Sequence, residues 1–374
     1  MTQRLGLLVN PIAGMGGRVA LKGTDGPQAL RIARERGAEP FAGGRALRAL
    51  QRLTAGGLPV QVLAAPGAMG ADVATAAGLQ AAVTGAAPSG PTGPDDTRRA
   101  AAAMARAPVD LLLFAGGDGT ARDIYDAIGA ALPLVGVPTG VKMHSGVFAA
   151  TPDAAGTVAA TFLRASGSVT LRDAEIADVD EDAARAGRAA ARLYGSVRVP
   201  REPALMVPAK AASPVHHQAA LEALCEDVAA KIAGGGSYLL GPGTTMARVL
   251  GALGERGTLL GVDAVADRHV VAADLDEAGI LERLAQAPDT RLLLGVIGGQ
   301  GSLLGRGNQQ LSPRVLRRLG AERIDVLAAA DKLLALDPPV LRLDTGDDEL
   351  DRVLSGYRRV RTGPRETIVM KVST

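Results

Sequence analysis

Residues 114–120 read Phe-Ala-Gly-Gly-Asp-Gly-Thr, and this stretch decides the fold. The apolar run from Val109 to Phe114 predicts a buried strand, and residues 121–131 predict a helix. Glycines at such a turn let the backbone bend sharply and approach a phosphate group closely. Asp118 stands alone among them and would repel phosphate, so the pattern favours a base, a ribose ligand or a metal partner. A purely structural turn can carry the same residues.

Strand and helix signals alternate through the chain, which predicts an α/β fold with helices on the faces of a parallel sheet. Further strands are expected at 4–9 and 134–137, and a helix followed by a strand at 42–64. A composition shift after Phe148 predicts a first domain of residues 1–148 and a second, mixed α/β domain of residues 149–311. Residues 312–374 return to the strand–helix rhythm and are expected to pack back on the first domain.

Composition excludes several classes of protein. The 374 residues are 47% apolar with a formal net charge of +2, which argues against nucleic acid or a membrane surface as a partner. Cys225 is the only cysteine, so an internal disulfide and a thiolate zinc cluster are excluded. The chain opens without a charged and apolar leader, and no apolar run reaches about 18 residues, so a cytoplasmic protein is expected.

Glycine-rich turns after strands are the candidate nucleotide- and phosphate-binding loops, although plain flexible turns remain the alternative. The first loop lacks the ending of a P-loop and the spacing of a dinucleotide fingerprint. The candidate residues in these loops are Asn10, Gly14, Gly16, Gly17 and Lys22; Gly116, Gly117, Gly119 and Thr120; Gly241, Gly243, Thr244 and Thr245; and Gly299, Gln300 and Asn308.

Polar side chains after the 134–137 strand and near residue 178 supply further candidates. Lys142 can screen phosphate charge as a point cation, and His144 can orient a phosphate or ribose or have a structural role. Asp178 and Asp180 share one face of an expected strand, where they can hold Mg²⁺ or ribose hydroxyls or form a solvated strand end. Arg122 is expected to pair with an acidic neighbour on its own helix, Asp123 or Asp126.

Together these segments resemble the NAD kinase superfamily, and most closely its branch of predicted ATP- or polyphosphate-dependent NAD kinases, which includes the X protein linked to acetoin catabolism. The matching segments lie in order over about three hundred residues. They are Asn10-Pro-Ile-Ala-Gly-Met-Gly-Gly, Leu21-Lys-Gly-Thr-Asp, Gly116-Gly-Asp-Gly-Thr-Ala-Arg-Asp, Gly140-Val-Lys-Met-His-Ser, Gly241-Pro-Gly-Thr-Thr and Gly298-Gly-Gln-Gly with Gly305-Arg-Gly-Asn-Gln-Gln.

The resemblance implies a two-domain kinase with a Rossmann-like N-terminal domain that transfers a phosphoryl group from ATP or polyphosphate, with Mg²⁺, to NAD. It implies that Asp118 is the base for the 2′-hydroxyl of the adenosine ribose and that Thr120 and the neighbouring glycines contact phosphates. A homo-oligomer is expected. The chain lacks the family's Asn-Glu motif for the nicotinamide ribose, for which Glu175 or Asp178 are the candidate replacements, and its second domain reads as mixed α/β rather than purely β.

Two other functions remain open at this stage. Diacylglycerol and sphingoid-base kinases share the Gly-Gly-Asp-Gly-Thr turn and need an apolar pocket for the acceptor, which the composition does not exclude. A regulatory protein that binds NAD without turnover is the alternative that is not an enzyme. A phosphofructokinase is disfavoured, because the arginine pattern for a sugar phosphate is not evident.

Overall fold

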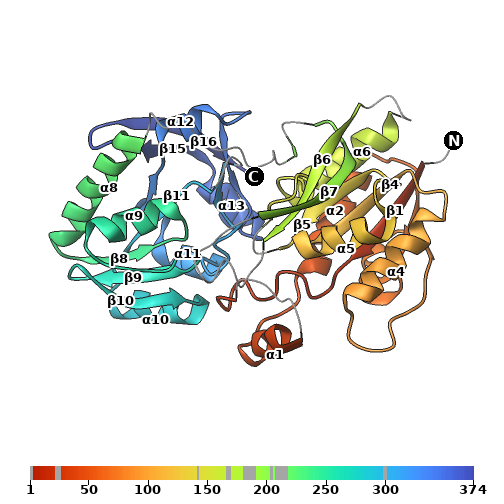
Figure 1. The fold of residues 1–374 in the computed structure, drawn as a ribbon, viewed down its shortest axis with the longest axis horizontal. Coiled ribbons are helices and arrows are strands. Elements are labelled where there is room, and N and C mark those ends of the chain that lie inside the picture. The colour runs from red at the N-terminus through yellow and green to blue at the C-terminus, as the bar shows by residue number, and fades with distance from the viewer. Residues whose placement is uncertain are drawn as a thin grey trace. The chain divides into compact units, whose positions relative to one another are not determined.

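The computed structural model describes residues 3–21, 27–140, 143–165, 170–179, 191–202, 205–206, 218–297 and 301–374. It divides into two compact units, Met1–Met15 with Gly23–Ala209 and Gly16–Lys22 with Lys210–Thr374. In Figure 1 most of the first unit runs from red to yellow-green, and most of the second runs from green to blue. The first glycine loop is therefore divided between the units after Met15. Among the described residues, no helix combines the length and apolar character needed to cross a membrane.

The first unit is built on a five-stranded parallel sheet in the order β3-β2-β1-β4-β5. Every residue of β4 and β5 is buried, as expected where helices cover both faces of a parallel sheet. The strand order reverses between β1 and β4, so their carboxyl ends lie at a topological switch point. The strands are β1 Gln3–Val9, β2 Val60–Ala64, β3 Ala81–Val83, β4 Leu111–Gly116 and β5 Leu134–Pro138.

Among the helices of the first unit, α2 packs against α6 and α3, and α4 packs against α5. From β1 the chain crosses to β2 on one side in the sheet, whereas from β3 it crosses to β4 and then β5 on the other side. Because crossovers between parallel strands are right-handed, this change of direction places α2 and the α4–α5 pair on opposite faces of the sheet. Helix α4 begins at Pro94, and the Asp96 side chain accepts the N–H of Gly93 at 2.9 Å at this start. The helices are α1 Pro27–Glu35, α2 Ala42–Thr54, α3 Ala71–Ala76, α4 Pro94–Ala105, α5 Asp118–Ile128 and α6 Pro152–Arg164, with a short 3₁₀ turn η1 at Gly67–Met69.

The chain after Phe148 still belongs to the first unit, so the predicted domain boundary at 148 is wrong. Helix α6 packs against α2, and Val158 and Leu163 join the same apolar core as Phe114. An antiparallel hairpin of β6 (Leu171–Val179) and β7 (Ala191–Pro200) follows, and Val197 is also part of that core. The composition shift reflects a change from sheet to hairpin within one unit rather than a change of domain.

The second unit contains a nine-stranded mixed sheet in the order β10-β9-β8-β11-β13-β15-β16-β14-β12. Strands β8, β11, β13 and β15 run parallel, whereas the β8–β9, β9–β10 and β15–β16 pairs are antiparallel. This confirms the expected mixed α/β second domain. The strands are β8 Ser237–Leu240, β9 Val262–Ala266, β10 His269–Leu275, β11 Arg291–Gly295, β12 Ser302–Leu304, β13 Ile324–Leu327, β14 Val340–Leu343, β15 Gly356–Arg361 and β16 Thr367–Ser373.

Two apolar cores lie within this unit. Helices α8 (Gln218–Ala233) and α9 (Thr244–Ala252) enclose one of them, which includes Leu224, Leu250 and Leu293. The other core receives side chains from α10 (Glu277–Gln286), α11 (Pro313–Leu319), α12 (Ala330–Leu334) and α13 (Asp348–Leu354). A short 3₁₀ turn, η4 (Ala321–Arg323), joins α11 to β13.

The C-terminal segment completes the second sheet, so the expectation that residues 312–374 pack back on the first domain is wrong. Strand β13 pairs with β11, and Val326, Leu341, Val360 and Val372 lie in the core of the second unit. The strand–helix rhythm of this segment identified its elements correctly, but such a rhythm carries no information about which sheet the strands join.

Candidate functional site

Asp118 lies at the switch point of the first sheet. Strand β4 ends at Gly116, Gly117 is the extended residue before α5, and Asp118 is the first residue of that helix. Its side chain is buried, with a relative exposure of 5%. A carboxylate in the first turn interacts favourably with the positive end of the helix dipole, and this compensates part of the cost of burying the charge.

Two backbone donors from the loop after β5 hold the Asp118 carboxylate. The N–H of His144 donates to Oδ2 at 2.5 Å, and the N–H of Ser145 donates to Oδ1 at 3.0 Å. One donor on each oxygen fixes the plane of the carboxylate. Because a carboxylate offers about four acceptor positions, these two donors alone do not exhaust its capacity. The fold therefore brings Asp118 into contact with His144 and Ser145, which lie 26 and 27 residues further along the chain.

Asn10 and Thr120 join the two strands at the switch point. The Asn10 side chain donates from Nδ2 to Thr120 Oγ1 at 2.9 Å and accepts the N–H of Ile12 at 3.3 Å. The backbone N–H of Asn10 donates to the carbonyl of Ala115 at 2.9 Å. Both polar atoms of the Asn10 side chain thus have partners within the protein, and Asn10 ties the loop after β1 to the first turn of α5.

The glycines around Asp118 have packing reasons of their own. A Cβ on Gly116 would lie 2.4 Å from the Cβ of Thr120, and a Cβ on Gly117 would lie 3.1 Å from the Cα of Gly140. Gly14 has a φ of +75°, and a Cβ there would lie 1.8 Å from the carbonyl oxygen of Thr139. Gly14 and Gly117 need to be glycine because the backbone of residues 139–140 approaches them closely, and Gly116 because the Thr120 side chain does. Gly119 lies in the first turn of α5, next to Asp118.

The expected partners of Arg122 are wrong, because Arg122 Nη1 binds Asp178 Oδ2 on β6 at 2.7 Å, while Asp123 binds Arg98 at 2.6 Å. Burial lowers the pKa of Arg122, but Asp178 and Tyr194 outweigh it and the pKa is raised. Asp178 is thus one partner of a partly buried ion pair, which disfavours it as a metal or ribose ligand.

Glu175, the other candidate replacement for the Asn-Glu motif, has an exposed side chain, and its carbonyl accepts the N–H of Gly146 at 2.9 Å.

The glycine–threonine loop of the second unit connects β8 to α9. Gly243 precedes α9 with a φ of +126°, makes no side-chain cap, and has open space where a Cβ would stand. Thr244 is exposed and Thr245 is buried in the first turn. Gly241 donates its N–H to Leu293 of the parallel neighbour β11 at 2.9 Å. An uncapped helix N-terminus beside open space fits an anionic group.

Asn308 and Gly17 have structural roles in the second unit. The Asn308 side chain is 1% exposed, donates to the Leu303 carbonyl at 2.9 Å and accepts the N–H of Gly305 at 2.8 Å. This arrangement disfavours Asn308 as a nucleotide ligand. A Cβ on Gly17 would overlap the Gln309 side chain, so this glycine, like its buried neighbour Gly16, belongs to a close-packed segment.

Several predicted site residues lie outside the described residues: Lys22, Lys142, Asp180, Gly299 and Gln300. Where the structure describes the chain, no group of three or more His, Cys, Asp or Glu side chains forms a metal site. Mg²⁺ in kinases is commonly held by substrate phosphates and one or two carboxylates. The described residues alone do not form a cage for a metal ion.

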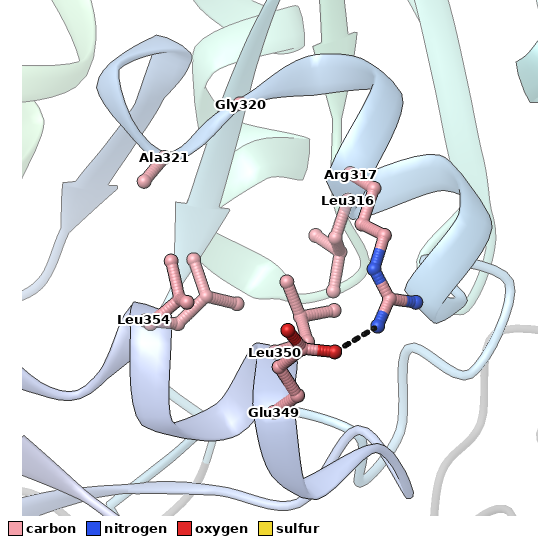
Figure 2. Close-up of a pocket in the computed structure, with 8 residues that line it drawn as sticks. Leu316, Arg317, Gly320, Ala321, Glu349, Leu350 and Leu354 are labelled. Carbon is pink, nitrogen blue, oxygen red and sulfur yellow. Dashed lines mark ion pairs between the residues drawn. The ribbon is translucent and has the colours of Figure 1, made fainter.

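A surface pocket of about 260 Å³ in the second unit is a separate feature (Figure 2). Leu316, Leu350 and Leu354 line it together with the Arg317–Glu349 ion pair of 3.9 Å. None of the predicted site residues lines this pocket. It lies between α11 and α13 rather than at the carboxyl ends of parallel strands, and it is not part of the candidate site.

The first unit thus has a buried carboxylate at the switch point of its parallel sheet, the position where doubly wound α/β proteins commonly bind ligands. Two family models match the chain: the ATP-NAD kinase N-terminal domain over residues 5–166 and the ATP-NAD kinase C-terminal domain over residues 235–372. The chain belongs to the NAD kinase family. Searches of curated proteins and of solved structures returned no match.

The structure also reveals residues that the sequence did not single out. Ser145 is fully buried, and besides its N–H bond to Asp118 its hydroxyl bonds the backbone of Ala177. Thr139 follows β5 directly and is 1% exposed, and its hydroxyl has no hydrogen-bond partner among the described residues. Thr139 and Ser145 stand on either side of the Lys142–His144 segment in the sequence. Their position beside these candidate residues is the sequence signal that could have identified them.

Proposed function

We propose that this protein is a kinase that phosphorylates the 2′-hydroxyl of the adenosine ribose of NAD, with ATP or polyphosphate as phosphoryl donor. One observation carries the proposal: a single buried carboxylate, Asp118, is held by the His144 and Ser145 N–H groups at the switch point of the first sheet. Membership of the NAD kinase family supports the choice of NAD as the acceptor.

The proposed reaction uses Asp118 as the base. Its carboxylate accepts the proton of the 2′-hydroxyl while the hydroxyl oxygen attacks the terminal phosphorus of the donor. The bond between that phosphorus and the bridging oxygen breaks, and the leaving group is ADP or a polyphosphate one unit shorter. Phosphoryl transfer depends mainly on alignment and on compensation of charge, so a carboxylate of fixed direction is the residue that such a reaction needs.

The remaining site residues are proposed to bind the two substrates. The uncapped N-terminus of α9, with Gly243 and Thr244, suits a phosphate group, because backbone N–H groups and the helix dipole both favour an anion there. His144 and Gly119 adjoin Asp118 in the first unit and are proposed to contact the acceptor. Lys142 and Lys22 are proposed to neutralise phosphate charge. A metal ion, when bound with the donor, would supply further compensation of the phosphate charge.

The test is a direct search for product. Purified protein is mixed with NAD, Mg²⁺ and either ATP or polyphosphate, and NADP is detected with an NADP-specific dehydrogenase. NADP formation that depends on the donor and is lost in Asp118→Asn supports the proposal. Absence of NADP with both donors refutes it. In a parallel reaction with radiolabelled ATP, phosphorylation of diacylglycerol or a sphingoid base would support the lipid kinase. NAD binding without turnover would support the regulatory protein.

A further inference from the structure

We propose that Ser145 is a positioning residue, whose hydroxyl anchors the loop after β5 to strand β6 and thereby fixes the direction of the Asp118 carboxylate. The inference rests on the function proposed above for Asp118. It assigns a role to Ser145, and also to the β6–β7 hairpin, beyond that of filling the first unit.

Ser145 is bonded on both sides. Its backbone N–H donates to Asp118 Oδ1 at 3.0 Å. Its hydroxyl donates to the Ala177 carbonyl at 2.8 Å and accepts the Ala177 N–H at 3.1 Å. The side chain is fully buried, so water cannot replace either bond. One residue therefore connects the backbone of β6 directly to an oxygen of the proposed base.

Strand β6 contacts the same region at further points, one of which is the Arg172 side chain that donates to the Gly146 carbonyl at 3.2 Å. Gly146, the next residue in the loop, donates its N–H to the Glu175 carbonyl at 2.9 Å. Arg122, one turn after Asp118 in α5, binds Asp178 at 2.7 Å. Glu175 and Ala177 of β6 thus bind the loop, and Asp178 binds the helix that carries Asp118. Since β6 pairs with β7 and not with the parallel sheet, it is a separate support for the site.

The physical consequence concerns alignment. Without the Ser145 hydroxyl, the loop keeps the Gly146 bond but loses both bonds to Ala177, and the two N–H groups that define the carboxylate plane gain freedom. Displacement of a reacting group by about 1 Å can reduce a rate by roughly 10²-fold. A merely structural residue would lower stability without selectively lowering kcat.

The experiment compares Ser145→Ala with Thr151→Ala. Thr151 is a matched control: it is a 5% exposed hydroxyl residue of the same unit, it accepts the N–H of Ala154 at 3.1 Å as the N-cap of α6, and within the described part of the chain its side chain makes no hydrogen bond to the loop that holds Asp118. We expect kcat for NAD to fall roughly 10-fold or more in Ser145→Ala, with KM changed less than about 3-fold. Thr151→Ala should keep kcat within about 2-fold below its melting temperature.

A double-mutant cycle separates positioning from general damage. If Ser145 acts through Asp118, Ser145→Ala should cause no further loss of the residual rate in the Asp118→Asn background, because residues that act as a unit are not additive. An equal fold-loss in both backgrounds, or a fall in kcat that Thr151→Ala reproduces, overturns the proposal.

Amide hydrogen exchange supplies a readout that needs no activity. The N–H groups of residues 144 and 145 should exchange roughly 10-fold faster in Ser145→Ala than in the unchanged protein or in Thr151→Ala. If NAD is not a substrate, the proposed function fails, while this measurement still decides whether Ser145 holds the loop. If Ser145→Ala cannot be obtained folded, Ser145→Cys, which adds little volume but makes only weak hydrogen bonds, should accelerate the same two amides. Unchanged exchange in the folded variant tested overturns the proposal.

Discussion

Replacement of Asp118 by Asn tests both the proposed base and the geometry that holds it. The carboxylate accepts one backbone N–H on each oxygen, from His144 and from Ser145. An Asn side chain has the same shape but only one acceptor oxygen, so its NH₂ group must face one of these two N–H donors. Asp118→Asn is therefore not a neutral replacement at this site, although it conserves volume.

The expected magnitude follows from these contacts. Loss of a hydrogen bond to a buried charged group costs about 1.5–3 kcal/mol, and loss of the charge in the first turn of α5 costs about 0.3–1 kcal/mol. The free energy of unfolding should fall by about 2–4 kcal/mol, which corresponds to a Tm lower by roughly 5–15 °C for a unit of this size. Loss of the base should lower kcat by roughly 10²-fold or more.

Calorimetry and the NADP assay measure the two effects on the same preparations. Asp110→Asn is the control, because Asp110 is exposed and accepts a backbone N–H, that of Arg4, at 2.7 Å. Its unfolding free energy should change by less than about 1 kcal/mol and its kcat should not change. An Asp118→Asn protein with the Tm of the unchanged protein would refute the hydrogen-bonding argument, and one with the same kcat would refute the role as base.

Three further predictions concern other residues. Gly243→Ala should lower the Tm by a few degrees, because a φ of +126° disfavours a side chain although no atom lies within 4 Å of the added Cβ. It should also raise the KM of the phosphoryl donor, and an unchanged KM would show that the loop does not bind phosphate. Asn308→Ala should lower the free energy of unfolding by about 1–3 kcal/mol, seen as a lower urea midpoint, and leave both KM values unchanged; a raised KM with unchanged stability would contradict its structural role. Burial raises the pKa of Cys225 from 9.0 to about 11, so its thiolate fraction at pH 8 should be about 100-fold lower than that of an exposed cysteine. Alkylation should be correspondingly slow until denaturant unfolds the chain, and fast alkylation of the folded protein would contradict this.

Much of the local structure could be predicted from the sequence, because the forces that determine it act over a few residues. The apolar run before Gly116 forms β4, and the glycines and Asp118 form the turn into α5. The helix expected within residues 42–64 forms α2, and the strand expected after it forms β2. The α/β class followed from the alternation of such segments.

The arrangement of these elements could not be predicted, because it depends on which apolar surfaces and polar groups meet across long separations. Residues 149–206 were assigned to the wrong domain, and so were residues 312–374, since a strand carries no local mark of the sheet that it joins. Arg122 was assigned an acidic neighbour on its own helix, but its partner Asp178 lies 56 residues away on β6.

For the candidate site, the sequence by itself determined the residue that carries the proposed chemistry, because an acid among glycines at a strand end is a local pattern. The tertiary structure alone decided what holds that acid. Ser145 and Asp118 are 27 residues apart, and Asn10 and Thr120 are 110 residues apart. They meet because the parallel sheet brings the carboxyl ends of β1, β4 and β5 to one edge, and the buried backbone N–H groups there bind the carboxylate that lies beside them.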